Sequence, residues 1–244
     1  MAVRHGYGKI VTDGLVLALD VADRNSYTSG STTWNDVSGN GNDVSVTTGP
    51  VFDTSSKSIV FDGIDDYLTL SNIDTHSSTA KFTIEGVVKP IGGNWGRIFT
   101  NGSNGIPGGI TGFINVDLLV LTNGSKPYIY LRVGNSLIFS TQVSTNNWGA
   151  EDFVMYFAFS ADKQTRTGSY LFRFGQNEGL IQNELSSTYT PGTATNFVEN
   201  RLGGETDNES YAEMNLSVFK IYNRELSINE MRQNYNHYKT RFGL

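Results

Sequence analysis

The carboxyl-terminal end of the chain carries a helix-start signal, whereas the rest of the sequence is written as strands and turns. Ser227 can cap the first turn of a helix, and Glu230, three residues later, can accept a hydrogen bond from the backbone of Ser227. Leu226 and Met231 stand where a hydrophobic staple would hold this turn. Bulky side chains then recur at helical spacing, at Ile228, Met231, Tyr235 and Tyr238. The pattern predicts one amphipathic helix over residues 227–240, packed by one face against an apolar surface.

The remainder of the chain reads as short strands separated by turn residues. Residues 153–159 are apolar on both faces, which favours a central place in a sheet. Other strands are predicted at 15–19, 58–62, 67–71, 82–89, 97–100, 116–121, 128–133, 170–174 and 215–222. Residues 63–66 and the Asn123-Gly124 dipeptide are hairpin signals between neighbouring strands. Roughly a dozen short strands, with no solenoid or propeller repeat, indicate an antiparallel β-sandwich.

Length and charge limit the classes of protein that this chain can belong to. We expect a polar arm over residues 1–13 and a single domain over 14–244, because no linker or shift of composition interrupts the 244 residues. The absence of cysteine excludes disulfides, thiol catalysis and cysteine-based zinc sites. A net charge of -6 without runs of like charge argues against a nucleic-acid partner. Apolar runs are strand-sized, so we expect no membrane insertion.

Five blocks, in order, resemble the laminin-G-like, concanavalin A-like lectin/glucanase superfamily. They include Trp-Asn-Asp-Val-Ser-Gly-Asn-Gly-Asn at 34–42 and Phe-Asp-Gly-Ile-Asp-Asp-Tyr at 61–67. The other blocks lie at 14–20, 82–85 and 219–230, so the resemblance spans nearly the whole chain. It implies an all-β fold: an antiparallel concanavalin A-like (jelly-roll) sandwich with a short C-terminal α-helix. Because this fold carries lectins, lyases, glucanases and pure interaction modules, it does not define an activity.

The early block at 34–42, together with the closing Asn-Tyr-Asn-His-Tyr-Lys-Thr-Arg-Phe-Gly at 234–243, is similar to proteins encoded by tailed bacteriophages. This resemblance implies a structural protein located in the virion: a capsid decoration, fibre or tail component with a lectin-like interaction domain. Its partners would be other virion proteins of the capsid or tail, and a homo-oligomer is a further option. The alternative is a carbohydrate-binding adhesin that recognises glycans of the host surface.

A third hypothesis, a polysaccharide hydrolase or lyase, requires catalytic groups that the sequence does not supply in a recognisable pattern. Glycosidases need two carboxyl groups facing each other across a cleft. Glu85 lies in an apolar strand where burial could raise its pKa, but no second acid shares its strand face. The sequence also lacks the Glu-x-Asp-x-Glu strand of the related glucanases. We therefore expect a structural role for Glu85, since buried ion pairs also perturb carboxylates, and a protein that is not an enzyme.

Metal binding has one weak candidate. Asp62, Asp65 and Asp66 surround Gly63 and could gather oxygen ligands for calcium. Asp and Gly also build turns without any ion, and we favour that explanation both here and for the loop at 36–43. The three histidines, His5, His76 and His237, lack partners in sequence and are expected to face solvent. No cofactor is predicted, with calcium as the one option left open.

Aromatic residues give the clearest indication of a binding surface. Tyr128, Tyr130 and Arg132 alternate on one face of their predicted strand, and such a row suits either a sugar ring or a protein neighbour. Trp95, flanked by glycine, and the nearby Arg97 could contribute from a loop. Tyrosine also favours strands for reasons of packing alone, and the two explanations stay open. Trp34 and Trp148 are expected to anchor the core.

Overall fold

The structure is a computed structural model. It describes residues 9–47, 49–70, 73, 81–91, 95–100, 114–120, 127–133, 136–142, 154–162, 167–174, 181–185, 200–204 and 211–244. For Trp95, for the strands within 114–142 and 181–185, and for part of 167–174, the description covers the backbone only.

The described strands form two antiparallel sheets and a small ribbon. The larger sheet contains β1 (Leu15–Asp20), β4 (Val51–Asp53), β5 (Ser58–Asp62), β7 (Lys81–Pro90), β12 (Met155–Asp162), β13 (Thr167–Phe174), β14 (Ile181–Leu185) and β16 (Glu213–Tyr222). The smaller sheet contains β6 (Leu68–Leu70), β8 (Trp95–Thr100), β9 (Ile114–Val120), β10 (Pro127–Val133), β11 (Ser136–Gln142) and β15 (Asn200–Leu202). The ribbon pairs β2 (Thr33–Trp34) with β3 (Val44–Ser45).

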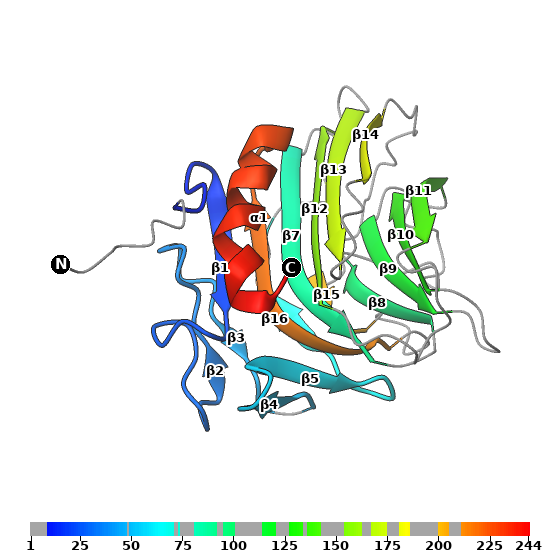
Figure 1. Cartoon of the computed structure of the whole chain (residues 1–244). Coiled ribbons are helices and arrows are strands. Elements are labelled where there is room, and N and C mark those ends of the chain that lie inside the picture. The colour runs from blue at the N-terminus through cyan, green and yellow to red at the C-terminus, as the bar shows by residue number, and fades with distance from the viewer. Residues whose placement is uncertain are drawn as a thin grey trace.

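Three layers result from this arrangement, with the larger sheet in the middle (Figure 1). Its order is β14-β13-β12-β7-β16-β5-β4, and β1 pairs with β16 beside this path. The smaller sheet, in the order β11-β10-β9-β8-β15-β6, lies on one side. The helix α1 (Ile228–Phe242) runs along β7 and β16 on the other side. The expected all-β sandwich with a C-terminal helix is confirmed.

The middle layer explains why its central strands are apolar on both faces. Phe82 and Ile84 of β7 and Phe157 of β12 point into the core between the sheets. Val87 of β7 and Tyr156 of β12, at alternate positions, belong to a second cluster that α1 covers. Every residue of β12 is buried, and its position between β13 and β7 confirms the central place that its sequence indicates.

The cap of α1 matches its sequence signal. Ser227 has extended backbone dihedrals, its side chain accepts a hydrogen bond from the Glu230 amide, and the Glu230 carboxylate accepts one from the Ser227 amide at 2.8 Å. The helix runs two residues beyond the predicted end and stops at Gly243, whose φ of 69° is left-handed. Leu226, just before the helix, and Met231, within it, are both buried. No described helix is long and apolar enough to cross a membrane.

Residues 36–42 protect the free edge of β1. The Ala18 amide donates to the Asp36 carboxylate at 2.9 Å, and the side-chain amides of Asn40 and Asn42 donate to the carbonyls of Leu15 and Val16. These polar side chains replace the hydrogen bonds of a missing neighbouring strand. Within the loop, the Asp36 carboxylate accepts hydrogen bonds from the amides of Ser38 and Asn42, so it helps to build the turn as expected.

The predicted hairpin across residues 63–66 is wrong. β5 pairs with β4 and β16 in the larger sheet, whereas β6 pairs with β15 in the smaller sheet. The turn carries the chain from one sheet to the other, because the apolar side chains of both strands fill the same core from opposite sides. The pairing of β9 with β10 is confirmed. Trp34 is fully buried, as expected, and Trp148 lies outside the described residues.

Candidate functional site

A pocket opens where the segment after β3 meets the start of β6, and we call it the rim pocket. Its volume is about 360 Å³, which falls within the usual size of a small-molecule site. The lining residues are Ser45, Thr47, Gly49, Asp65, Tyr67, Leu68 and Thr69. These two segments are brought together by the crossing of the chain between sheets, which no local sequence pattern indicated.

The lining of the rim pocket is polar with one aromatic ring. Ser45, Thr47 and Thr69 are exposed and carry hydroxyl groups that both donate and accept hydrogen bonds. Tyr67 is 37% exposed, and the Arg201 guanidinium lies 4.1 Å from the centre of its ring. This contact holds the ring in place against β15. The pocket therefore offers hydroxyls, a carboxylate and a fixed aromatic surface to a ligand.

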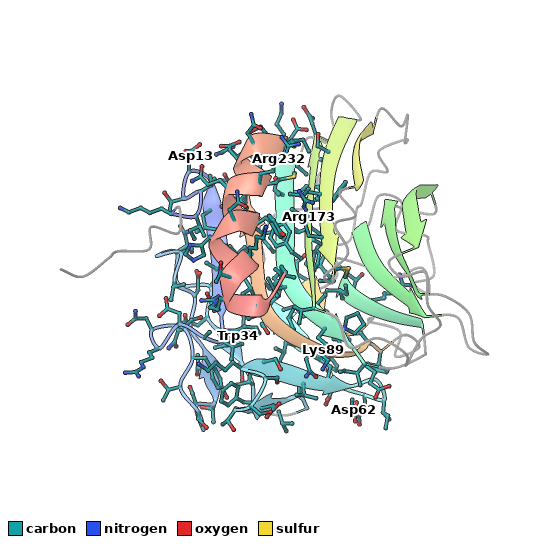
Figure 2. All side chains as sticks on the ribbon, in the orientation of Figure 1. Asp13, Trp34, Asp62, Lys89, Arg173 and Arg232 are labelled. Carbon is teal, nitrogen blue, oxygen red and sulfur yellow. The ribbon has the colours of Figure 1, made fainter. Side chains whose placement is uncertain are left out.

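Asp65 connects the rim pocket to the acidic turn that follows β5. The carboxylate oxygens of Asp62, Asp65 and Asp66 lie within 4.8 Å of one another. Asp62 accepts hydrogen bonds from the amides of Ile64 and Asp65, and Asp66 accepts one from the Asp62 amide at 2.9 Å. Figure 2 shows Asp62 at the end of β5, away from Trp34.

Electrostatics make Asp66 the unusual member of this turn. Burial raises the pKa of its carboxyl, and the neighbouring Asp62 and Asp65 raise it further, while the hydrogen bond from the Asp62 amide opposes them. The hydrogen bonds within the turn hold its shape, although it does not form the hairpin that the sequence predicts. The cluster could add a few oxygens to a hard cation such as calcium, which takes 6–8, so water or a ligand would have to supply the others. Calcium binding stays a prediction.

Glu85 does not face the rim pocket; it lies between the larger sheet and α1. Its carboxylate is fully buried and accepts three hydrogen bonds, from Lys220 Nζ at 2.8 Å, Tyr156 OH at 2.9 Å and Asn234 Nδ2 at 2.9 Å. Lys220 is 1% exposed and stands directly opposite Glu85 in the β7–β16 ladder. This ion pair gives Glu85 the structural role that we expected.

Sequence reasoning did not single out Lys220, although a signal was present. It is the one charged side chain between Leu216 and Tyr222, and it falls on the face opposite to Phe219 and Ile221. Lys220 is a lone cation, and Glu85 a lone acid, in strands that are apolar on both faces. Because a buried charge is costly unless it is paired, the two side chains are expected to pair with each other.

Other buried carboxylates in the described part of the chain also have cationic partners. Asp20 binds Arg241 at 2.6 Å, and Asp162 binds Lys81 at 2.7 Å. Asp66 is the exception among the described residues. These pairs hold α1 and the strand ends in place, and none of them places two free carboxyl groups across a cleft.

The predicted binding residues lie on β8 and β10, the two strands that flank β9 in the smaller sheet. Trp95 begins β8, so its expected place in a loop is wrong; the segment pairs with β9. Leu119 of β9 stands opposite both Trp95 and Tyr128, and Asp117 stands opposite both Arg97 and Tyr130.

The ladder thus aligns these predicted residues, with Arg132 two positions further along β10. The side chains of Trp95, Tyr128, Tyr130 and Arg132 lie outside the described residues. Arg97 is partly buried.

The remaining predicted polar residues add no cluster of their own. His237 is half-buried and its ring lies edge-on against Tyr238, so the expectation that it faces solvent is only partly met. His5 and His76 lie outside the described residues.

Comparison with known proteins gives structural neighbours but no family. No family model matches the chain, and no curated protein matches it. A mutant of Trypanosoma rangeli sialidase displaying trans-sialidase activity is 14% identical with a TM-score of 0.60, over 97% of this chain and 35% of that one. The binding domain of botulinum neurotoxin DC, in complex with rat synaptotagmin II, is 13% identical with a TM-score of 0.61, over 93% and 52%.

A leech intramolecular trans-sialidase is 14% identical with a TM-score of 0.53, over 72% of this chain and 26% of that one. The chain therefore spans about a third of the trypanosomal enzyme and about half of the toxin domain. Identities of this size show the fold alone. That fold is an all-β antiparallel sandwich.

Proposed function

We propose that this protein is a non-enzymatic recognition module that binds a carbohydrate in the rim pocket. The observation that carries the proposal is the lining of the pocket: three hydroxyl side chains, one carboxylate and one exposed tyrosine. Hydroxyls and a carboxylate can exchange hydrogen bonds with the hydroxyls of a sugar, and an aromatic ring can pack on its apolar face. A few convergent polar groups beside such a surface are typical of small-molecule sites.

The positions of the carboxylates support the non-enzymatic part of the proposal. Glu85 is held by Lys220 under α1, where no polysaccharide reaches it. Asp62, Asp65 and Asp66 belong to one turn and do not flank a cleft from opposite sides, as a pair of glycosidase carboxyls must. Incubation with bacterial polysaccharides is expected to release no reducing ends and no unsaturated products. Catalytic release of either product would contradict this part of the proposal.

A glycan array of bacterial polysaccharides tests the binding itself. We expect the wild type to be retained on at least one class of glycan, and Tyr67→Ala to weaken that binding by about tenfold, which corresponds to about 1.4 kcal/mol. Ile64→Ala is the matched control, because Ile64 is 73% exposed on the same turn but does not line the pocket. Circular dichroism verifies that both variants fold.

A third variant separates the rim pocket from the aromatic row predicted on β10. Tyr130→Ala is expected to bind like the wild type. Loss of binding in Tyr130→Ala with retention in Tyr67→Ala would move the ligand to the smaller sheet and contradict the pocket assignment. A blank array would contradict carbohydrate binding altogether.

A second candidate function is the virion structural role that the sequence resemblance implies. It is favoured by exposed apolar side chains at the edge of the larger sheet: Val51 of β4 is 65% exposed, and Ile64 follows β5. A strand edge of this kind can dock a protein neighbour. Mass spectrometry of purified bacteriophage particles tests the role directly, and absence of the protein from the particles would contradict it.

A further inference from the structure

Lys220, Glu85 and Asn234 meet between β16, β7 and α1, in a region closed to solvent. All three side chains are at most 1% exposed. Their surroundings are the rings of Tyr156, Tyr222 and Tyr238, and Lys220 Nζ lies 4.2 Å from the centre of the Tyr238 ring. The buried ion pair described above accounts for Glu85 and Lys220, but not for the arrangement of the amide beside them.

One carboxylate binds both nitrogens that an amide exchange would need. Glu85 Oε1 accepts from Lys220 Nζ at 2.8 Å, and Oε2 accepts from Asn234 Nδ2 at 2.9 Å. Glu85 can therefore take a proton from the amine and deliver one to the nitrogen that leaves, as a general base and then a general acid. A lysine amine freed of its proton is a nucleophile toward carbonyl carbon.

The carbonyl of Asn234 is polarised at the same time. Its Oδ1 accepts the backbone amide of Val11 at 2.8 Å, where negative charge would develop during attack on Cγ. Nδ2 also donates to the Tyr222 hydroxyl at 3.0 Å, and that hydroxyl donates to the Val11 carbonyl, so the carboxamide is held in one orientation. The nucleophile, proton carrier and oxyanion donor are all present before any reaction.

We propose that Lys220 and Asn234 form an intramolecular isopeptide bond, with Glu85 moving the protons. Lys220 gives a proton to Glu85, and the neutral Nζ attacks Cγ of Asn234. The tetrahedral oxyanion is stabilised by the Val11 amide. Glu85 then protonates Nδ2, the Cγ–Nδ2 bond breaks, and ammonia leaves. The new amide nitrogen then carries two hydrogens; it keeps one and passes the surplus proton to Glu85, which ends as a neutral carboxylic acid. No oxidant, reductant or cofactor is required, because both bonds are amides.

The bond would tie α1 covalently to β16. The exclusion of water from the tyrosine-lined region prevents competing hydrolysis of the asparagine. The reaction also needs the native fold, since Glu85 and Lys220 are distant in sequence and meet only in the β7–β16 ladder. This modification is independent of the carbohydrate proposal, and neither result decides the other.

Intact-mass spectrometry of the purified, denatured full chain tests the proposal. We expect a mass below that of the unmodified sequence by one molecule of ammonia, and a digest in which the peptides carrying Lys220 and Asn234 are joined. Recovery of these two peptides unlinked, from folded wild type of unmodified mass, would overturn the proposal.

Variants identify the chemistry. Asn234→Asp is expected to lose one molecule of water instead of ammonia, whereas Lys220→Gln and Glu85→Gln are expected to keep their full mass. Lys81→Gln is the matched control: it removes a lysine that also binds a buried carboxylate, and it should retain the loss of ammonia. A joined peptide pair that persists in Glu85→Gln would remove Glu85 from the reaction. The wild-type mass decides the bond even if a variant does not fold.

Discussion

Disruption of the Glu85–Lys220 pair should destabilise the fold far more than disruption of an exposed pair. In Glu85→Gln the Lys220 ammonium stays buried at 1% exposure without its carboxylate, and the Tyr156 and Asn234 donors face a weaker acceptor. In wild type whose intact mass shows that Lys220 is unlinked, removal of one partner from the buried pair costs about 3–5 kcal/mol, because the other charge is left uncompensated. An isopeptide bond in the wild type would add the loss of that bond to the cost of each variant. The same range is expected for Lys220→Met, which leaves the carboxylate behind.

The control for this prediction is the Arg224–Asp13 pair. The Asp13 side chain is 86% exposed, so Asp13→Asn should lower the free energy of unfolding by no more than about 1 kcal/mol. The assay is guanidinium unfolding followed by circular dichroism, with the slope of the transition checked for constancy. In the double variant Glu85→Gln/Lys220→Met the loss should be clearly less than the sum of the single losses. A Lys220→Met variant no less stable than Asp13→Asn would refute the reasoning.

Four further predictions concern the helix cap, the acidic turn and the close packing of a glycine. Ser227→Ala should lower the free energy of unfolding by about 1 kcal/mol in the same assay. Hydrogen bonds from Arg224 and Ser227 lower the pKa of Glu230 from 4.5 to about 2. The stability that ionised Glu230 contributes is therefore present above pH 4.5 and is lost as the pH falls toward 2. Glu230→Gln should remove that part of the pH dependence of the free energy of unfolding. The pKa of Asp66 is raised in the fold, so its charge opposes folding at neutral pH and ceases to do so at pH values below 3.8. Asp66→Asn should therefore unfold at a higher denaturant concentration than the wild type at pH 7. A lower unfolding midpoint would contradict the direction of this effect. Gly203 has a φ of 86°, and a Cβ there would collide with the Phe61 ring. Thermal melting of Gly203→Ala should therefore show a loss of stability of about 2 kcal/mol or more. The loss should be clearly smaller in the control Gly30→Ala, because Gly30 has a similar φ of 83° but open space around it.

The elements that sequence predicted well are those with a strong local signal. Ser227 and Glu230 form a capping box with a fixed spacing, and the two apolar faces of residues 153–159 require cover on both sides. Both signals depend on neighbours a few residues apart, so they survive without knowledge of the tertiary structure.

The features that the sequence did not predict depend on pairing between strands that are far apart in the chain. The turn at 63–66 has the residues of a hairpin, yet the chain crosses to the other sheet there. A bulge in β16 between Leu216 and Val218 shifts its register against β7, and the pairing of Glu85 with Lys220 follows from that shift. The rim pocket depends on the same crossing, since it joins residues 45–49 to residues 65–69. The crossing and the rim pocket have no periodic pattern that could indicate them, and the Glu85–Lys220 contact left only a lone charge in each of two apolar strands.

The location of carbohydrate binding is tested most directly by chemical-shift mapping on the isotopically labelled full chain. A glycan retained on the array is titrated into the protein, and the perturbed backbone amides are assigned. The rim-pocket account predicts that the largest perturbations fall at Ser45, Thr47, Tyr67 and Thr69. Perturbations confined to β10 or to α1, with those four amides unchanged, would contradict it.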